Sequence, residues 1–442
     1  MNSLDAAESP VAEVGRRGLA GLALLSLVTG AGTGLAVACF RLALERADVY
    51  RDALIAWAHQ WSVFGFVIVI AATATATALA VWLVRWSGQP AEGSGIPHVE
   101  AVIDRELPAA SFLLFPVKFV GGLLAIGAGL ALGREGPSVQ MGANLGSVWA
   151  KIFRASDADH LALVAAGAGA GLATAFNAPI AGAVFVLEEL VRRFDPRMAV
   201  AALSASAAAI TVARLLIGHE PDFNLEVLPY AGFSSGILFA VLGILAGCAG
   251  VAYNRAIMGL RTLSDRATRW HPELRAAVIG IAVGGVAWFA PRLVGGGDGL
   301  TQACLVGKVG LAILPLVFII RFLLGPVSYA AGAPGGLFAP MLVLGAQMGL
   351  TFGVLCHSVL GDVGAPPIAF AVVGMAAFFA AVVRAPVTGI VLSIELTAGF
   401  NQLLPMLWAC FAAMAIPMML GNPPIYDSLK ERLLRLLPHR EP

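Results

Sequence analysis

Long apolar runs recur along almost the whole chain and constrain its fold more than any other feature. They approach or reach the roughly 17–25 residues that a helix needs to cross a bilayer, and they lie at 18–38, 64–83, 111–132, 237–251, 311–320 and 369–383. The runs are continuous rather than alternating, which argues against a transmembrane β-barrel. Only 12% of the 442 residues are charged, against about 25% in a soluble domain. The sequence therefore predicts an all-α polytopic membrane protein.

The charge distribution predicts how the chain is oriented. Arg16 and Arg17 precede the first apolar run, and the C-terminal stretch KERLLRLLPHREP is basic. The positive-inside rule therefore places both termini in the cytoplasm, with residues 1–14 and 436–442 as short tails. The first residues do not follow the basic-then-apolar pattern of a signal peptide. A formal net charge of +1 argues against a nucleic-acid partner.

Three blocks of sequence occur twice, in the same order and at a nearly constant spacing. In each pair the matching positions include glycines, and two of the pairs also share a proline. The pairs are Glu92–Ile103 with Gly296–Val306, Gly136–Gly146 with Ala339–Gly349, and Ala178–Leu190 with Ala385–Thr397. The nearly constant spacing between the paired blocks predicts two related halves of the chain, 15–225 and 226–435. Duplicated halves are typical of transporters, whose substrate site lies between the halves near the middle of the membrane.

Glycine and proline interrupt the apolar segments in both halves. GSGIP (Gly93–Pro97), GREGP (Gly133–Pro137) and GGLFAP (Gly335–Pro340) each combine glycines with a proline near an expected helix start. A helix N-terminus carries roughly half an elementary positive charge, and glycine lets backbone N–H groups approach a ligand closely. Several such N-termini within a membrane predict an anion site. The alternative for each motif is close packing of helices through small residues.

These motifs, together with PPIYDSL around Tyr426, resemble the signature elements of the CLC chloride channel and transporter family. The resemblance follows the family's order and covers essentially the whole membrane region. It implies a fold of two inverted-topology repeats with tilted, broken helices. It also implies a homodimer in the lipid bilayer, with one pathway in each subunit, and a multi-pass protein of the cell inner membrane. No CBS domain is expected.

The resemblance also implies a chloride site. Its residues would be neutral donors: the hydroxyls of Ser94 and Tyr426 and the backbone N–H groups of Leu337 and Phe338. An outer anion site would use the backbone of Gly133, Arg134 and Glu135. Neutral donors bind chloride without trapping it, as conduction requires. The alternatives are that Ser94 bridges helices and that Tyr426 is an interfacial aromatic residue.

Two glutamates match positions at which the family moves protons. Glu135 matches the external gate, a carboxylate that competes with chloride when ionised and moves away when protonated. Glu189 matches the internal proton-transfer glutamate of proton-coupled members, a position that is typically not acidic in channels. The alternatives are an ion pair of Glu135 with Arg134, and a solvated Glu189 paired with Arg192 or Arg193.

Two further acids and the remaining polar residues receive simpler interpretations. Glu188 and its counterpart Glu395 are expected to hydrogen-bond helix ends, with Glu188 also placed to help protons reach Glu189. The cysteines and histidines lack metal-site spacing, so no metal or cofactor is expected.

The sequence favours a chloride/proton antiporter, with chloride and protons as its partners. A passive channel of the same architecture is the first alternative, because only Glu189 separates the two. An intramembrane enzyme is the second, and it would need a nucleophile with a base or paired aspartates at membrane depth. Ser94 has no histidine or lysine partner identifiable from spacing, so no enzymatic activity is expected.

Overall fold

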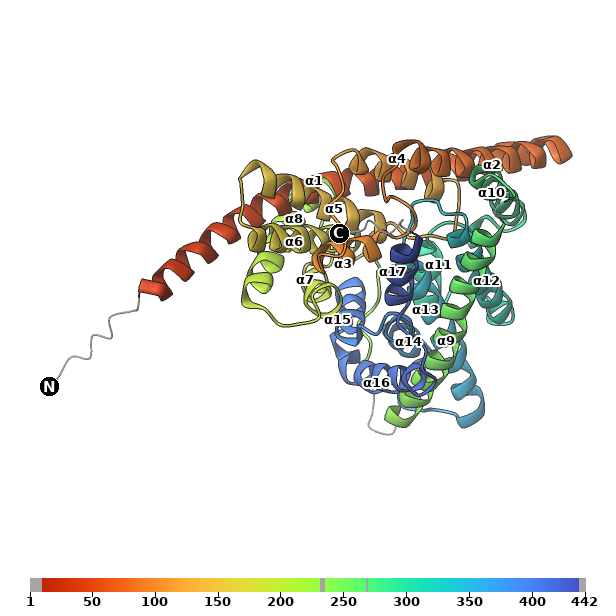
Figure 1. Cartoon of the computed structure of the whole chain (residues 1–442). Helices are drawn as coiled ribbons and strands as arrows, with labels where there is room; N and C mark the ends of the chain where they lie inside the picture. The colour runs from red at the N-terminus through yellow and green to blue at the C-terminus, as the bar shows by residue number, and fades with distance from the viewer. Residues whose placement is uncertain (1–9, 231–234, 268, 437–442) are drawn as a thin grey trace.

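The computed structural model describes residues 10–230, 235–267 and 269–436, and its regular structure is helical (Figure 1). Most of the two predicted tails, 1–14 and 436–442, lies outside the described residues. Within the described residues, seven helices are long and apolar enough to cross a membrane. The predicted all-α class therefore agrees with the structure.

The order of helices in the first half repeats in the second. The first half contains α1 (Pro10–Ala58), α2 (Ser62–Ser87), α3 (Ile96–Ile103), α4 (Leu114–Gly127), α5 (Glu135–Ile152), α6 (Asp157–Phe176), α7 (Pro179–Phe185) and α8 (Pro196–Ile217). The second contains α9 (Gly236–Arg266), α10 (Pro272–Phe289), α11 (Asp298–Leu305), α12 (Leu314–Ala330), α13 (Phe338–Leu360), α14 (Pro367–Val383), α15 (Pro386–Thr397) and α16 (Leu403–Met419). A last helix, α17 (Ile425–Leu436), carries the C-terminal end.

Several helices are too short to cross a bilayer, as the glycine and proline breaks predict. The third helix of each half, α3 or α11, has eight residues, and α7 has seven. At about 1.5 Å per residue these helices span well under half of the hydrocarbon core. Their ends therefore lie inside the protein, where loops supply polar backbone groups.

Glycine contacts between helices bring the centre of the molecule together. A Cβ atom added at Gly142 of α5 would lie 2.1 Å from the Gly167 carbonyl oxygen of α6. The corresponding helices of the second half are equally close, because a Cβ atom added at Gly345 of α13 would lie 2.3 Å from the Gly374 carbonyl oxygen of α14. Both pairs pack backbone against backbone, as small residues allow in membranes. These glycines, which lie outside the three glycine–proline motifs, thus serve helix packing.

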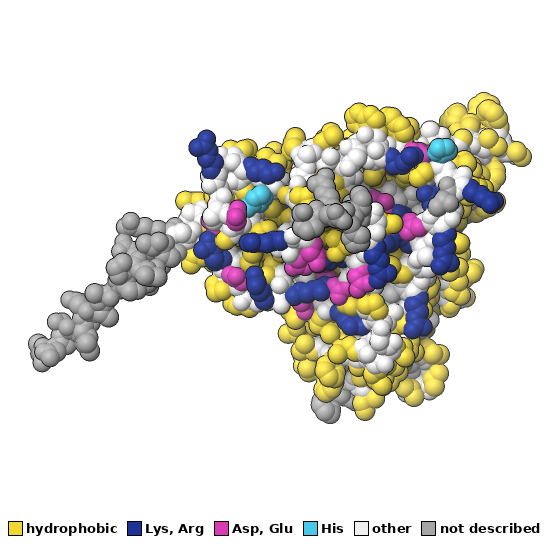
Figure 2. Space-filling view, viewed as in Figure 1, with side chains coloured by type: hydrophobic (Ala, Val, Ile, Leu, Met, Phe, Trp, Pro, Cys, Tyr) yellow, Lys and Arg dark blue, Asp and Glu magenta, His cyan; other side chains and the backbone are white. Residues whose placement is uncertain are grey.

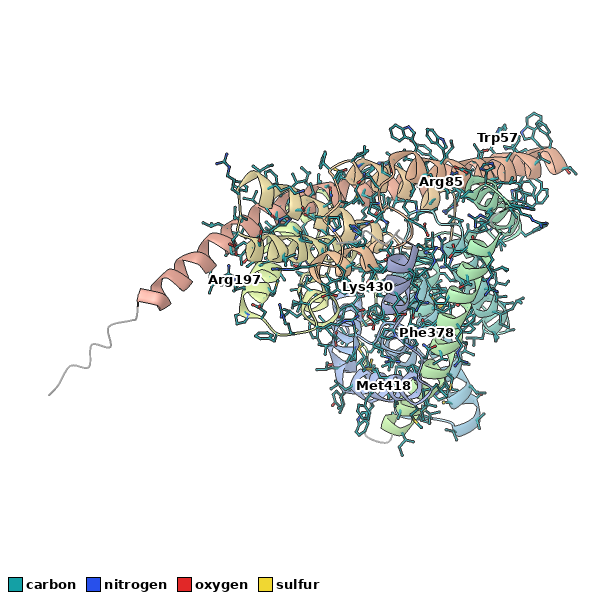
Figure 3. The ribbon with its side chains drawn as sticks, viewed as in Figure 1. Trp57, Arg85, Arg197, Phe378, Met418 and Lys430 are labelled. Carbon is teal, nitrogen blue, oxygen red and sulfur yellow. The ribbon has the colours of Figure 1, made fainter. Side chains whose placement is uncertain are left out.

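The outer surface separates apolar and charged side chains. Figure 2 shows Lys, Arg, Asp and Glu gathered across the middle of one face, with hydrophobic side chains around it. Lys430 of α17 lies in this charged area, whereas Trp57 and Met418 lie toward the periphery (Figure 3). Trp57 and Met418 are 46% and 61% exposed, which suits contact with lipid. The chain is a multi-pass membrane protein.

Candidate functional site

The carboxylate of Glu135 lies against the N-terminus of α13. Its Oε1 accepts hydrogen bonds from the backbone N–H groups of Phe338 at 2.5 Å and Ala339 at 3.2 Å. Glu135 is the first residue of α5 and is fully buried. Two helix N-termini, one from each half of the chain, therefore meet at this carboxylate. Amide N–H groups at a helix start favour an anion in this position.

The donors to Glu135 overlap with the predicted chloride donors at Phe338, and the assignment of Leu337 and Phe338 to chloride stays a prediction. The resemblance names Leu337 and Phe338, whereas the donors to Glu135 are Phe338 and Ala339. Leu337 is the residue that precedes α13 and is buried beside the site. The first turn of a helix has several unpaired N–H groups, and the approach of the carboxylate decides which of them it meets.

The glycines around the acid provide space for its side chain. Gly133 and Gly336 pair as an isolated β-bridge, with N···O distances of 2.9 and 2.7 Å. A Cβ at Gly133 would lie 2.1 Å from Oε2 of Glu135, and one at Gly336 would lie 2.5 Å from Oε1. Any larger residue at either position would collide with the carboxylate, which explains the glycines that flank it in the sequence.

Ser94 and Tyr426, the two predicted side-chain donors to chloride, lie close to Gly136 and Phe338 respectively. Both residues are fully buried, and neither hydroxyl has a hydrogen-bond partner among the described residues. A Cβ at Gly136, next to Glu135, would lie 2.6 Å from Ser94 Oγ. The ring of Tyr426 stacks on Phe338 with centroids 6.1 Å apart. Buried hydroxyls are normally hydrogen-bonded, so two unpaired donors beside an amide nest point to a ligand.

A buried lysine holds the loop that carries Ser94. Lys118 of α4 is fully buried, and its Nζ donates to the carbonyl oxygens of Ala91 at 3.0 Å and Gly93 at 2.7 Å. The Ser94 N–H donates to the hydroxyl of Tyr329 at 3.4 Å. The loop is thus positioned from both halves of the chain, since Tyr329 lies in α12.

Arg134 and Glu135 do not pair with each other, so the ion-pair alternative is wrong. Arg134 Nη2 contacts Asp222 at 2.8 Å and its Nη1 lies 3.3 Å from Asp298. Arg41 also contacts Asp222, at 2.8 Å. Asp222 belongs to the segment between α8 and α9, and its side chain is only 7% exposed. Nothing in the local sequence pattern marks either aspartate as a partner of Arg134.

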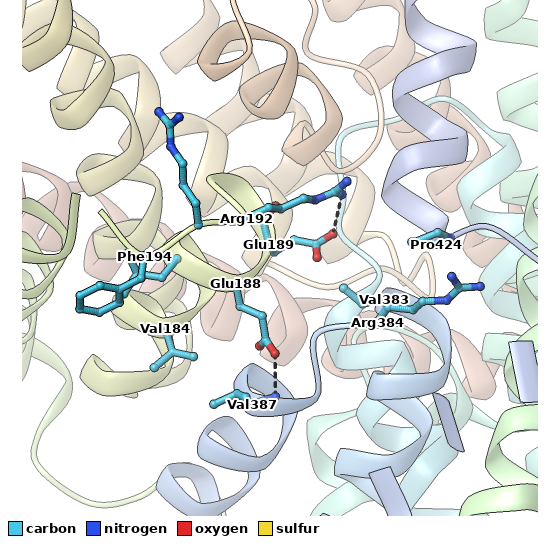
Figure 4. A pocket seen from close by; sticks show the side chains of 11 residues that line it. Val184, Glu188, Glu189, Arg192, Phe194, Val383, Arg384, Val387 and Pro424 are labelled. Atoms are coloured by element: carbon cyan, nitrogen blue, oxygen red, sulfur yellow. Dashed lines mark hydrogen bonds and ion pairs between the residues drawn. The ribbon is translucent and has the colours of Figure 1, made fainter. Parts of the chain in front are cut away.

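Glu188 and Glu189 lie in a single π-helical turn, η2 (Val186–Leu190), that continues α7. π-Helical turns are rare in proteins, and those that occur are often found at functional sites. Glu188 turns toward α15, where it accepts the N–H of Val387 at 3.0 Å. Glu189 extends in a different direction, toward Arg192 (Figure 4). The Glu189 side chain is 4% exposed, and its Oε1 lies 3.7 Å from Nη2 of Arg192. The predicted Arg192 contact is therefore present, but Glu189 is buried rather than solvated.

Glu188 and Glu189 line a cavity of about 560 Å³ beside α15 and the start of α17 (Figure 4). Arg192, Arg193 and Arg384 line it as well. Glu100 of α3 is another buried acid in this region, and both of its carboxylate oxygens lack a partner among the described residues. The lining is largely apolar, but its charged side chains mark a route by which water can approach the buried carboxylate of Glu189.

Comparison with known proteins assigns this geometry to a family. The model of the voltage gated chloride channel family matches residues 76–417. The H(+)/Cl(-) exchange transporter ClcA of Cronobacter sakazakii is 36% identical over 421 residues, covering 93% of this chain and 89% of the relative. ClcA of Vibrio cholerae serotype O1 is 36% identical over 422 residues, covering 93% and 89%.

Solved structures share the fold. A slow cyanobacterial Cl⁻/H⁺ antiporter has a TM-score of 0.87 at 32% identity, covering 94% of this chain and 98% of the other. A eukaryotic CLC transporter has a TM-score of 0.80 at 23% identity, covering 95% and 74%, and shows likeness of fold alone. The predicted fold of inverted repeats with broken helices is thereby confirmed.

Proposed function

This chain belongs to the voltage gated chloride channel family, or CLC family, and on that premise we propose that it exchanges chloride for protons across the membrane. Relatives named as H(+)/Cl(-) exchange transporters and a neighbouring structure of a Cl⁻/H⁺ antiporter favour exchange over a passive channel. The observation that carries the mechanism is the Glu135 carboxylate bound to the N–H groups of α13 beside two unpaired hydroxyls.

In the proposed mechanism, chloride and Glu135 compete for the same donors. The nest at Phe338 and Ala339, with the hydroxyls of Ser94 and Tyr426, offers four neutral hydrogen-bond donors around one point. Neutral donors stabilise an anion while letting it leave, because no full cation of opposite charge binds it there. An ionised Glu135 closes this site. A protonated Glu135 loses its charge, gives up the nest and lets chloride enter.

The proton reaches Glu135 by a route separate from the chloride donors. We assign the internal end of this route to Glu189, which is buried beside the cavity at η2 and so exchanges protons with water there. Each proton that binds Glu135 releases the nest for chloride, and each chloride that occupies it keeps Glu135 away. Exchange follows from this mutual exclusion.

The charged face of Figure 2 is proposed to be cytoplasmic, with both termini on that side. Arginine and lysine residues near η2, α8 and α17 support this orientation under the positive-inside rule. A homodimer in the cell inner membrane, with one pathway per subunit, follows the family resemblance. Cross-linking in native membranes tests the dimer, and protease accessibility of the C-terminus tests the orientation.

A flux assay tests the function directly. The purified chain is placed in liposomes loaded with chloride, and chloride and proton electrodes record both ions in the external medium. Exchange predicts that chloride leaving down its gradient drives protons into the liposomes against theirs. Chloride movement without uphill proton movement would instead establish a passive channel.

A further inference from the structure

Arg192 lies between two carboxylates that come from distant parts of the chain. Its Nη2 forms an ion pair with Oδ1 of Asp427 and lies 3.7 Å from Oε1 of Glu189. Its Nε donates to the backbone oxygen of Glu189 at 3.1 Å. Arg192 has a φ of 53°, a left-handed conformation that returns its side chain over the end of η2 (Figure 4).

The guanidinium also lies on the solvent side of the buried acid. The Arg192 side chain is 48% exposed and that of Asp427 is 31% exposed, against 4% for Glu189. Within the described part of the chain, Arg192 is the one cation within 4 Å of the Glu189 carboxylate. It is therefore the charge that most directly sets how easily this acid binds a proton.

Other charged groups face Glu189 from the surrounding elements, and most are engaged elsewhere. Glu188 on the same turn is bonded to the start of α15. Arg384, at the end of α14, donates to the Asn422 carbonyl. Lys430 of α17 lies 2.5 Å from Asp104 and 2.6 Å from Glu106. The remaining groups are Glu100 of α3, Tyr426 of α17 and the exposed Arg193.

Two carboxylates therefore share one guanidinium. An ionised Asp427 forms an ion pair with Arg192. Glu189 can therefore bind a proton and lose its charge while the guanidinium still has an acidic partner. An opposite charge within about 4–6 Å favours the ionised form of an acid, and a like charge favours the protonated form. Arg192 and Asp427 thus act on Glu189 in opposite directions.

We propose that Arg192 and Asp427 are positioning residues that set the pH at which Glu189 takes up a proton from the cytoplasm. This inference rests on the proposed role of Glu189 as the internal proton site. It makes the ion pair part of proton transfer rather than only a link between η2 and α17.

A purely structural role is the competing explanation, because Asp427 follows Tyr426 in the chain. Loss of the ion pair could then displace α17 and the Tyr426 hydroxyl. Other ion pairs also hold α17, including Arg432 with Asp265 at 2.8 Å. Burial disfavours the Lys430 ammonium, but hydrogen bonds to Asp104 and Glu106 outweigh it and raise the pKa of Lys430. These contacts keep α17 in place when Asp427 is neutralised.

The experiment measures chloride-driven proton uptake by the full-length chain in liposomes, with the same pH on both sides, across a range of pH. Asp427→Asn removes a negative charge, so that Arg192 interacts with Glu189 alone and favours its ionised form. Proton uptake should therefore decline at a lower pH than in the wild type. Arg192→Gln removes the cation, so the decline should move to higher pH. Each shift should be about half a pH unit or more.

Matched controls come from an ion pair on the same face with similar exposure. Arg197 and Asp159 are paired, with side chains 44% and 23% exposed. Arg197→Gln and Asp159→Asn should leave the pH dependence unchanged. Calorimetric titration with chloride should give affinities within about twofold of wild type for all four variants, because displacing Tyr426 would remove a hydroxyl donor and weaken binding by roughly two- to twelvefold.

Opposite shifts with unchanged chloride affinity would support the inference. Shifts in the same direction, no shift, or a loss of chloride affinity in both variants would overturn the inference. The ion pair of Arg192 and Asp427 would then only hold α17 in place. Glu189→Gln tests the premise separately. Proton uptake like that of wild type in this variant would refute Glu189 as the internal site, whatever the other two variants do.

Discussion

Glu188 and Glu395 cap each other's helices across the two halves of the chain. The Glu188 carboxylate accepts N–H groups at the start of α15, including that of Thr388 at 2.6 Å. The Glu395 carboxylate, near the end of α15, accepts N–H groups at the start of α7, including that of Ala181 at 2.7 Å. Glu188 follows α7 and Glu395 lies near the end of α15, and each meets the beginning of the other helix, so the two helices run antiparallel. The expectation that these acids hydrogen-bond helix ends is confirmed.

Neutralising either cap should destabilise the protein by a similar amount. Glu188→Gln and Glu395→Gln each replace charge-assisted hydrogen bonds by neutral ones, which costs about 1–2 kcal/mol. Thermal unfolding in detergent should show comparable losses, with proton coupling retained in liposomes. Loss of coupling in Glu188→Gln alone would contradict a purely capping role and place Glu188 on the proton route.

Glu135→Gln should keep chloride flux and lose proton coupling. The amide has the shape of the carboxylate, but it neither carries a proton nor competes as an anion for the N–H groups of Phe338 and Ala339. Simultaneous chloride and proton recordings from liposomes measure both effects. Uphill proton movement at the wild-type rate in this variant would refute Glu135 as the gate.

Gly133→Ala should displace the Glu135 carboxylate without disturbing the backbone. The nearest atoms to an added Cβ all belong to the Glu135 side chain, the closest at 2.1 Å. The variant should therefore conduct chloride with weakened proton coupling. Gly285→Ala is the matched control, because nothing lies within 4 Å of a Cβ there.

The double variant Gly133→Ala with Glu135→Gln separates this effect from general damage. If the methyl group acts only through the carboxylate, the double variant should transport chloride like Glu135→Gln alone. A further large loss of flux would show that Gly133 has another role in the pathway.

Ser94→Ala combined with Tyr426→Ala should weaken chloride binding only partly. Two hydroxyl donors are lost, each contributing about 0.5–1.5 kcal/mol, while the backbone donors of α13 remain. Calorimetric titration should show an affinity lower by about 1–3 kcal/mol. An unchanged affinity would remove both hydroxyls from the site.

Glu189→Ala should abolish proton movement while chloride still flows, because the chloride donors lie on α13, α17 and the Ser94 loop. Chloride binding should change little. Glu188→Ala is the control on the adjacent residue, whose carboxylate is bonded to α15, and it should affect proton movement much less. Equal loss in both variants would indicate damage to η2 rather than removal of a proton site.

The sequence predicted the parts of the site that depend on local pattern. Apolar runs indicated the membrane helices, and repeated blocks indicated the duplication that the order of helices reproduces. Glycine with proline marked the starts of α3, α5 and α13, since these residues favour turns and first helical positions. The motifs named Ser94, Glu135, Phe338 and Tyr426, which lie close together in the structure, and their roles in binding chloride and protons stay predictions. The predicted boundaries of the halves stay a prediction.

The partners of the charged groups depended on the tertiary structure. Arg134 could pair with its neighbour in the sequence, but it contacts Asp222, 88 positions away. The Phe338 amide that binds Glu135 is 203 positions from it, and Asp427 is 235 positions from Arg192. Sequence spacing specifies which residues share a face of one helix over three or four positions. It does not specify which helices meet, because that is decided by the packing of the whole apolar interior, and so the ion pairs around Glu135 and Glu189 followed only from the folded chain.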